Sequence, residues 1–217
     1  MTNAQQLPVI RFWFEFASTY SYPAVARIEA EAAAARVVVE WQPFLLGPIF
    51  GAQGWSDSPF NVYPAKGRYM WRDLERICSG MNLPFRRPSI FPQNGLLAAR
   101  VATVANLDAG AHWCPAFTRA VFAANFVEGR DISRSETIAE CLAVAGQPAG
   151  EVLERAAQPE VKARLRQATE EAMALGIFGA PSFTIGDEVF WGNDRLEQAL
   201  SWAKGGGKTP VVSPVVY

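Results

Sequence analysis

Three hydroxyl side chains stand where a predicted strand gives way to a predicted helix. Ser18, Thr19 and Ser21 follow an aromatic stretch at residues 9–16 and precede an alanine-rich run at residues 24–35. Hydroxyls in that position lie at a helix N-terminus, where free N–H groups carry partial positive charge and favour an anion. Ser18 is therefore a candidate for holding a thiolate, a carboxylate or a phosphate. Simple helix capping by the same side chains is the alternative.

The other reactive side chains predict no second site. Cys78, Cys114 and Cys141 are far apart and form no C-x-x-C pair, so neither a redox dithiol nor a zinc site is predicted, and no metal is expected. We interpret them as reduced, buried thiols. The single histidine, His112, has no nucleophile beside it in the sequence, and the chain lacks P-loop and dinucleotide-binding motifs.

Composition and charge describe a globular chain without a strong electrostatic field. Of its 217 residues, 50% are hydrophobic and 19% are charged, and the net charge is −1. That balance argues against disorder and against nucleic acid or an anionic membrane as partner. The N-terminus lacks the basic and apolar parts of a signal peptide, and no apolar run reaches the roughly 18 residues of a membrane span. We therefore expect a cytoplasmic protein.

The hydroxyls belong to a predicted β-α-β unit. Phe12, Phe14 and Phe16 alternate along the first strand, residues 22–35 are typical of a helix, and residues 37–44 predict a second strand. A helix between two strands implies a right-handed crossover and parallel pairing.

A second strand-rich unit lies far along the chain. Residues 182–191 predict a hairpin with Gly186 first in a type II′ turn. A final helix follows at residues 193–203, where Asp194 and Glu197 have capping-box spacing.

A long loop and a helical block separate the two units. Residues 45–63 contain glycines, prolines and aromatic residues without a period, which predicts a loop that is either functional or packed on the surface. Residues 64–175 show successive helical patterns, one of them starting at a capping box of Ser133 and Glu136.

The predicted fold class is α/β, a thioredoxin-like domain (β-α-β … α-β-β-α) with a large all-helical insertion. The predicted divisions are a thioredoxin-like domain at residues 8–46 and 176–205, with the helix 160–175 leading back into it, an active-site loop at 47–63, a helical insertion domain at 64–158 and a C-terminal tail at 206–217, flexible or laid along a surface.

Four motifs, in this order, resemble a known family. They are F-E-F-A-S-T-Y-S-Y at residues 14–22, P-A-K-G-R-Y-M at 64–70, G-I-F-G-A-P at 176–181 and W-G-N-D-R-L-E at 191–197. Over nearly its whole length the chain resembles the 2-hydroxychromene-2-carboxylate isomerases and the kappa-class glutathione S-transferases, both of the DsbA-like thioredoxin-fold group.

The resemblance implies a glutathione site. Ser18 matches the serine that hydrogen-bonds the glutathione sulfur. Pro181 matches a cis-proline, and the backbone of Ala180 matches the group that pairs with the cysteinyl part. Asn193 and Asp194 match the pair that holds the γ-glutamyl end.

Two departures from the family pattern concern the same site. Thr19, which we also expect to contact glutathione, stands where the family has proline. Gly54 and Trp55 occupy the place of a Gly-Asn pair, and Asn61 lies nearby. The expected substrate-binding residues are Trp55, Asn61, Tyr63 and Lys66, with Phe60 and Phe91 as further walls and Arg68 and Arg195 as further cations.

By resemblance the chain is a glutathione-dependent isomerase of a small aromatic substrate. In that reaction the thiolate adds reversibly to an oxygen-containing ring, the ring opens, a bond rotates and the thiolate leaves, so glutathione acts as a cofactor. A homodimer is expected. A kappa-like transferase that conjugates glutathione to an electrophile is one alternative, and a non-catalytic thioredoxin-fold binding protein is another.

Overall fold

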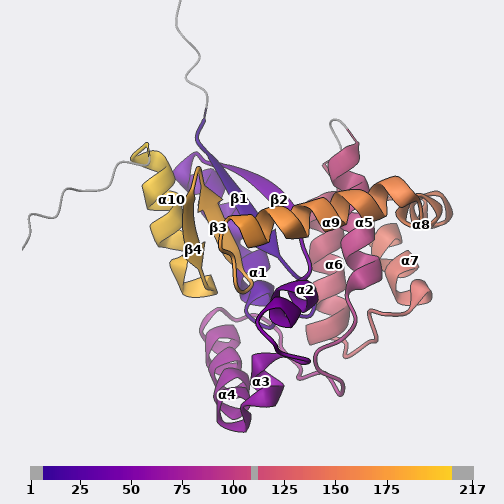
Figure 1. The fold of residues 1–217 in the computed structure, drawn as a ribbon, viewed down its shortest axis with the longest axis horizontal. Coiled ribbons are helices and arrows are strands. Elements are labelled where there is room, and N and C mark those ends of the chain that lie inside the picture. The colour runs from indigo at the N-terminus through magenta and orange to yellow at the C-terminus, as the bar shows by residue number, and fades with distance from the viewer. Residues whose placement is uncertain (1–6, 109–111, 207–217) are drawn as a thin grey trace, which may run out of the picture.

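A four-stranded sheet forms the centre of the structure, a computed structural model that describes residues 7–108 and 112–206. The strand order is β2-β1-β3-β4 (Figure 1). β1 (Val9–Phe14) and β2 (Val38–Pro43) are parallel and are joined by α1 (Ser21–Ala35). The predicted β-α-β unit is therefore confirmed.

The second unit returns to the sheet on the other side of β1. β3 (Ser182–Ile185) pairs antiparallel with both β1 and β4 (Glu188–Trp191). Gly186 turns the hairpin with a φ of 57°, the positive value that a type II′ turn requires at its first central residue. The hairpin is as predicted.

The two faces of β1 pack against different helices. Phe12 and Phe14 point into the larger core, which also contains residues of α1 and of α10 (Leu196–Lys204). Trp13 points to the opposite face, where it meets Phe44 at a ring distance of 6.0 Å and residues of α9 (Pro159–Ala174). Side chains alternate along a strand, so one aromatic stretch fills both layers.

The helical block lies beside the sheet and below it. Figure 1 shows α5 to α8 gathered at one side, and α4 with α3 below. The predicted all-helical character of this block is confirmed. Its helices are α4 (Pro64–Gly80), α5 (Leu96–Leu107), α6 (Cys114–Phe126), α7 (Ser135–Val144) and α8 (Ala149–Ala156).

The predicted loop at residues 45–63 is partly wrong, because two short helices lie in it. These are α2 (Leu46–Ala52) and α3 (Pro59–Val62). Ser58 caps α3 by accepting a hydrogen bond from the Phe60 N–H, and proline occupies the first helical position. Helices this short have no room for an apolar period, so the pattern search missed them.

Both predicted capping boxes are wrong. Helix α7 begins at Ser135, and the Ser133 hydroxyl donates to Asp131 at 2.6 Å. The last helix begins at Leu196, after a 3-10 turn, η1 (Asn193–Arg195), that contains Asp194. Ser133 interacts with Asp131, and Asp194 interacts with Arg195, so each side chain has a partner close by in the sequence instead of capping the helix.

Several other expectations can be compared with the described residues. Cys78, Cys114 and Cys141 are free and buried, as expected. In the described part of the chain, no helix is long and apolar enough to cross a membrane. Residues 207–217 of the predicted tail lie outside the described residues. The division into domains remains a prediction.

Candidate active site

Ser18 lies in the turn between β1 and α1, where it contacts the second half of the chain. Its backbone N–H donates to the Glu15 carbonyl at 3.0 Å, which closes the turn. Its hydroxyl donates to the Ala180 carbonyl at 2.8 Å and accepts the Ser21 N–H at 3.3 Å. The fold thus joins two residues 162 positions apart.

The start of α1 leaves polar groups available around this contact. The N-cap residue, Tyr20, makes no side-chain cap, and the first turn has no acidic residue. The Ser21 hydroxyl oxygen is buried and lacks a hydrogen-bond partner among the described residues. Thr19, in contrast, is only 1% exposed, so its side chain is hidden from solvent. A positive helix end without its own anion lies next to the Ser18 hydroxyl.

Pro181 follows a cis peptide bond after Ala180, as the resemblance implied. Ala180 and Ser18 are each 9% exposed, so both border the surface. The Pro181 carbonyl accepts the Gly192 N–H at 2.9 Å, which ties this turn to the one at Asn193.

Arg27 holds the Asn193 turn in place. Its Nε donates to Asn193 Oδ1 at 3.1 Å, and its guanidinium also contacts the Asn193 carbonyl, Glu31 and Glu197. Asn193 is therefore occupied within the protein. The side chain of Asp194 is 73% exposed, paired with Arg195 at 3.3 Å, and can receive a ligand cation. We call Ser18, Ala180, Asn193 and Asp194 the serine end of the site.

The sequence interpretation missed Arg27 and Glu15. The Glu15 carboxylate accepts the Ala17 N–H at 2.9 Å. Burial raises the pKa of Glu15 to about 7, against a smaller lowering by the amides of Ala17 and Ser18. A carboxylate inside an aromatic stretch was the available signal for Glu15. The sequence contained no comparable signal for Arg27, a single basic residue in an alanine-rich helix.

Tyr20 connects the serine end of the site to helices α3 and α4. Its hydroxyl donates to Asp73 of α4 at 2.9 Å, and its ring lies 6.2 Å from the ring of Phe60 in α3. Burial, with smaller contributions that include the charges of Asp73 and Asp194, raises the pKa of the Tyr20 hydroxyl.

Three of the predicted substrate-binding residues come together on these helices. Trp55 and Tyr63 meet edge to face at 6.5 Å, and the Lys66 ammonium lies 5.2 Å from the centre of the Tyr63 ring. Tyr63 is 45% exposed, so this group faces solvent. We call Trp55, Tyr63 and Lys66 the aromatic end.

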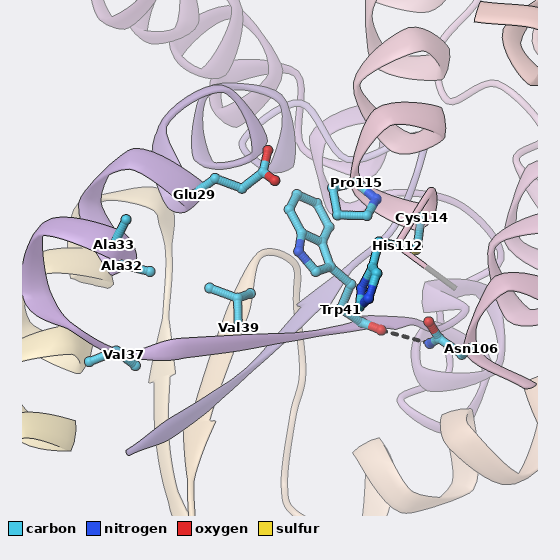
Figure 2. Close-up of a pocket in the computed structure, with 10 residues that line it drawn as sticks. All are labelled: Glu29, Ala32, Ala33, Val37, Val39, Trp41, Asn106, His112, Cys114 and Pro115. Atoms are coloured by element: carbon cyan, nitrogen blue, oxygen red, sulfur yellow. Dashed lines mark hydrogen bonds between the residues drawn. The ribbon is translucent and has the colours of Figure 1, made fainter. Parts of the chain in front are cut away.

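Asn61 and Phe91 line a hollow of about 430 Å³, to whose walls Trp55, Tyr63 and Lys66 do not belong. The Asn61 amide donates to the Phe91 carbonyl at 3.1 Å and to Asp57. Arg87 lines the same hollow with its guanidinium 4.7 Å from the Trp71 ring centre. Another hollow, of about 470 Å³, lies elsewhere, along β2 (Figure 2).

The arrangement of the serine end suits a negatively charged sulfur or oxygen. A hydroxyl, the backbone carbonyl that precedes β3 and a helix N-terminus converge there, and an exposed carboxylate lies nearby for a cationic group. The aromatic end adds ring surfaces and one ammonium group.

The chain is similar over most of its length to proteins of known name. A 2-hydroxychromene-2-carboxylate isomerase of Sphingobium xenophagum is 29% identical over 189 residues, 87% of this chain and 94% of that protein. Glutathione S-transferase kappa 2 of Caenorhabditis elegans is 26% identical over 212 residues, 89% and 91% of the two chains. These relatives indicate an enzyme.

The fold is also similar to that of a solved isomerase structure. A solved structure of a 2-hydroxychromene-2-carboxylate isomerase superposes with a TM-score of 0.79 at 23% identity, over 91% of this chain and 95% of that one. The sequence model of the DSBA-like thioredoxin domain family matches residues 9–202 of this chain. The predicted fold class is confirmed, and the chain belongs to the DsbA-like thioredoxin-domain family.

Proposed function

We propose that the protein is a glutathione-dependent isomerase of a 2-hydroxychromene-2-carboxylate-like aromatic acid. The observation that carries the proposal is the 2.8 Å contact between the Ser18 hydroxyl and the Ala180 carbonyl at the start of α1. This contact brings a proton donor for sulfur next to a backbone that can pair with a peptide. The named isomerase and transferase relatives support this proposal.

The residues present fit glutathione. The Ala180 backbone can pair with its cysteinyl part, and the exposed Asp194 carboxylate can hold its ammonium group. The buried Ser21 hydroxyl without a partner leaves one polar atom for a ligand or water to satisfy. When bound, glutathione supplies a thiolate nucleophile and is returned unchanged.

Ser18 has to change its partner for this role. Its hydroxyl proton now points to the Ala180 carbonyl. A ligand N–H that takes over this carbonyl would release the Ser18 proton toward the ligand sulfur. The Ser21 N–H, which donates to the Ser18 oxygen, polarises the hydroxyl and strengthens it as a donor.

The free energies are large enough to favour a thiolate near neutral pH. An ordinary thiol has a pKa of about 8.5, and each unit of lowering needs about 1.36 kcal/mol. A charge-assisted hydrogen bond supplies roughly 1.5–3 kcal/mol, and a helix N-terminus adds about 0.3–1 kcal/mol. Ser18 then stabilises the thiolate and is no nucleophile itself.

The aromatic end would receive the acceptor. The rings of Trp55 and Tyr63 offer apolar walls, and the Lys66 ammonium can pair with a carboxylate. A small-molecule substrate, a cytoplasmic location and a homodimer belong to the same proposal.

The thiolate absorbance of bound glutathione tests the proposal. We expect a thiolate band in the ultraviolet difference spectrum near neutral pH, and its loss in Ser18→Ala, with turnover reduced by about 10²–10³-fold. Ser201→Ala, at an exposed serine on α10, is the matched control and should leave the band unchanged. If glutathione does not bind, a non-catalytic binding protein becomes the better interpretation.

A kappa-like transferase is the second candidate, because the serine end would serve either reaction. The two differ in the fate of glutathione. Quantifying free glutathione after many turnovers separates them, because an isomerase returns all of it and a transferase consumes one molecule per product.

A further inference from the structure

Glu15 places a carboxyl group in the same turn as Ser18, and the proposed reaction does not yet use it. Its Oε2 accepts the Ala17 N–H at 2.9 Å, and the Ser18 N–H also stabilises the carboxylate. The Ser18 nitrogen is three covalent bonds from the Ser18 hydroxyl oxygen, which the proposed function assigns to the glutathione sulfur. The carboxylate and the sulfur would therefore lie on either side of one residue.

The helices that pack against this turn bring neutral groups to it. An added Cβ at Gly95, the residue before α5, would lie 3.3 Å from Glu15 Oε1, so the start of α5 packs against the carboxylate. Asn125 of α6, which is 1% exposed, donates to the Phe16 carbonyl at 3.3 Å. Glycine and asparagine carry no charge, so neither contact balances a negative charge on Glu15.

The charged residues of the neighbouring helices have other partners or lie too far away to act on Glu15. Those of α1, α5 and α6 are Arg27, Glu29, Glu31, Arg100 and Arg119. Arg27 pairs with Glu31, and Arg119 pairs with Glu29. None of the five is a cause of the raised pKa of Glu15, which results from burial. Within the described residues, backbone amides alone stabilise the ionised carboxylate.

Two negative charges at this turn would repel each other. Bond lengths and hydrogen-bond distances put a sulfur on the Ser18 hydroxyl within about 10 Å of the Glu15 carboxylate. At that separation and an effective dielectric constant of about 20, a thiolate raises the pKa of Glu15 by about one unit. Because burial has already raised this pKa to about 7, the carboxyl group would then be mostly protonated near neutral pH.

We propose that Glu15 takes up the proton that the glutathione thiol loses when it binds at Ser18. The S–H bond of the thiol breaks, an O–H bond forms on the Glu15 carboxylate, and the total charge of the site stays constant. Glu15 is in partial contact with solvent, so the proton can move through water and Glu15 need not touch the ligand. This inference rests on the proposed function, because it concerns glutathione bound as a thiolate.

The proton on Glu15 removes the repulsion that an ionised carboxylate would exert on the thiolate. When the sulfur is protonated again, Glu15 returns the proton. Glutathione therefore binds and leaves with little net proton exchange near neutral pH. A site that stabilised the thiolate without Glu15 would instead release about one proton for each glutathione bound, because the free thiol is mostly protonated at this pH.

Titration calorimetry of glutathione in buffers of different ionisation enthalpy counts the protons released on binding. At pH 7.5 we expect less than about half a proton per glutathione from the wild type and about one from Glu15→Gln. Glu75→Gln, at an exposed glutamate paired with Arg72, is the matched control and should follow the wild type. S-methylglutathione has no thiol proton, so its binding should release none from either protein.

The infrared difference spectrum of the wild type gives a test that does not depend on the folding of a variant. Glutathione should add the carbonyl band of a protonated carboxyl group, and S-methylglutathione should not. Release of about one proton by the wild type, or no new carboxyl band with glutathione bound, would overturn this inference and leave the proposed function standing. Absence of glutathione binding, or no proton release from Glu15→Gln, would overturn both.

Discussion

The serine end and the aromatic end of the site are built in different ways. Three of the four residues of the serine end, Ser18, Ala180 and Asn193, are each at most 9% exposed and are held by hydrogen bonds between distant segments, whereas Asp194 is exposed. Tyr63 is 45% exposed, and the aromatic end is held by ring contacts within residues 50–66. The first is fixed by the whole fold, and the second by one short stretch of chain.

The difference assigns separate tasks to the two ends. A buried, cross-linked group suits a constant ligand such as a cofactor, because its geometry changes little. An exposed group on short helices can vary without unfolding the protein, which suits substrate choice. Changes at one end should therefore leave the other end intact, and four substitutions can test this separation.

Gly67→Ala should have the largest effect on stability. A Cβ at Gly67 would lie 2.3 Å from the Phe60 carbonyl oxygen, which is backbone and cannot turn away. We expect a loss of about 2–3 kcal/mol in the free energy of unfolding by urea, and a displaced aromatic end with glutathione affinity retained. Gly80→Ala is the matched control on the same helix, because nothing lies within 4 Å of its added Cβ. Equal effects of both variants would contradict the prediction.

Arg27→Gln should weaken the serine end without touching the ligand. The variant loses the charged anchor of Asn193 and Glu197. We expect the Kd of glutathione in calorimetry to rise about 30-fold, equivalent to about 2 kcal/mol, with the KM of the acceptor unchanged. Arg72→Gln breaks an exposed pair with Glu75 and serves as control. An unchanged glutathione Kd in Arg27→Gln would show that the anchor is dispensable.

Glu15→Gln should change how stability depends on pH. Folding raises the pKa of Glu15 from 4.5 to about 7, so the folded state holds this proton more tightly than the unfolded state. The resulting stability is complete below pH 4.5 and is lost as the pH rises through 7. At about 1.36 kcal/mol per pKa unit, this shift contributes at most about 3 kcal/mol to the free energy of unfolding. Partial contact of Glu15 with solvent lowers the contribution to about 2 kcal/mol.

Chemical denaturation at pH 5 and pH 8 measures this effect. Between these values the wild type should lose about 2 kcal/mol more than Glu15→Gln. Because the ionised carboxylate is adjacent to Ser18, the variant should also form the glutathione thiolate at lower pH. Glu75→Gln, at an exposed pair, should follow the wild type. Parallel pH profiles for Glu15→Gln and the wild type would refute the assignment.

Lys66→Gln should have the smallest effect, confined to the aromatic end. Its ammonium is exposed and stabilised by the Tyr63 ring, an interaction of about 0.5–1 kcal/mol. We expect the KM of a carboxylate-bearing acceptor to rise about threefold, with glutathione Kd unchanged. Arg72→Gln, at an exposed arginine that pairs with Glu75 on the same helix, is the control. A change in glutathione affinity would mean that the two ends are coupled.

Local patterns predicted most elements of the fold. The alternation of Phe12, Phe14 and Phe16 and the alanine-rich run after them specified β1 and α1, and Gly186 specified the hairpin. Prediction failed where helices were a single turn or two long, as in α2 and α3, and at Ser133 and Asp194, where nearby partners replaced the helix caps.

For the candidate site, the sequence alone determined the residue types: a hydroxyl before a helix, a proline after alanine and an aromatic stretch followed by lysine. Tertiary structure decided which of them meet. It brought Ser18 to Ala180, paired Asn193 with Arg27, paired Asn61 with the Phe91 carbonyl and buried Glu15 near the serine. The physical reason is that strand and helix patterns depend on neighbours in sequence, whereas hydrogen-bond partners and burial depend on segments more than 100 residues away.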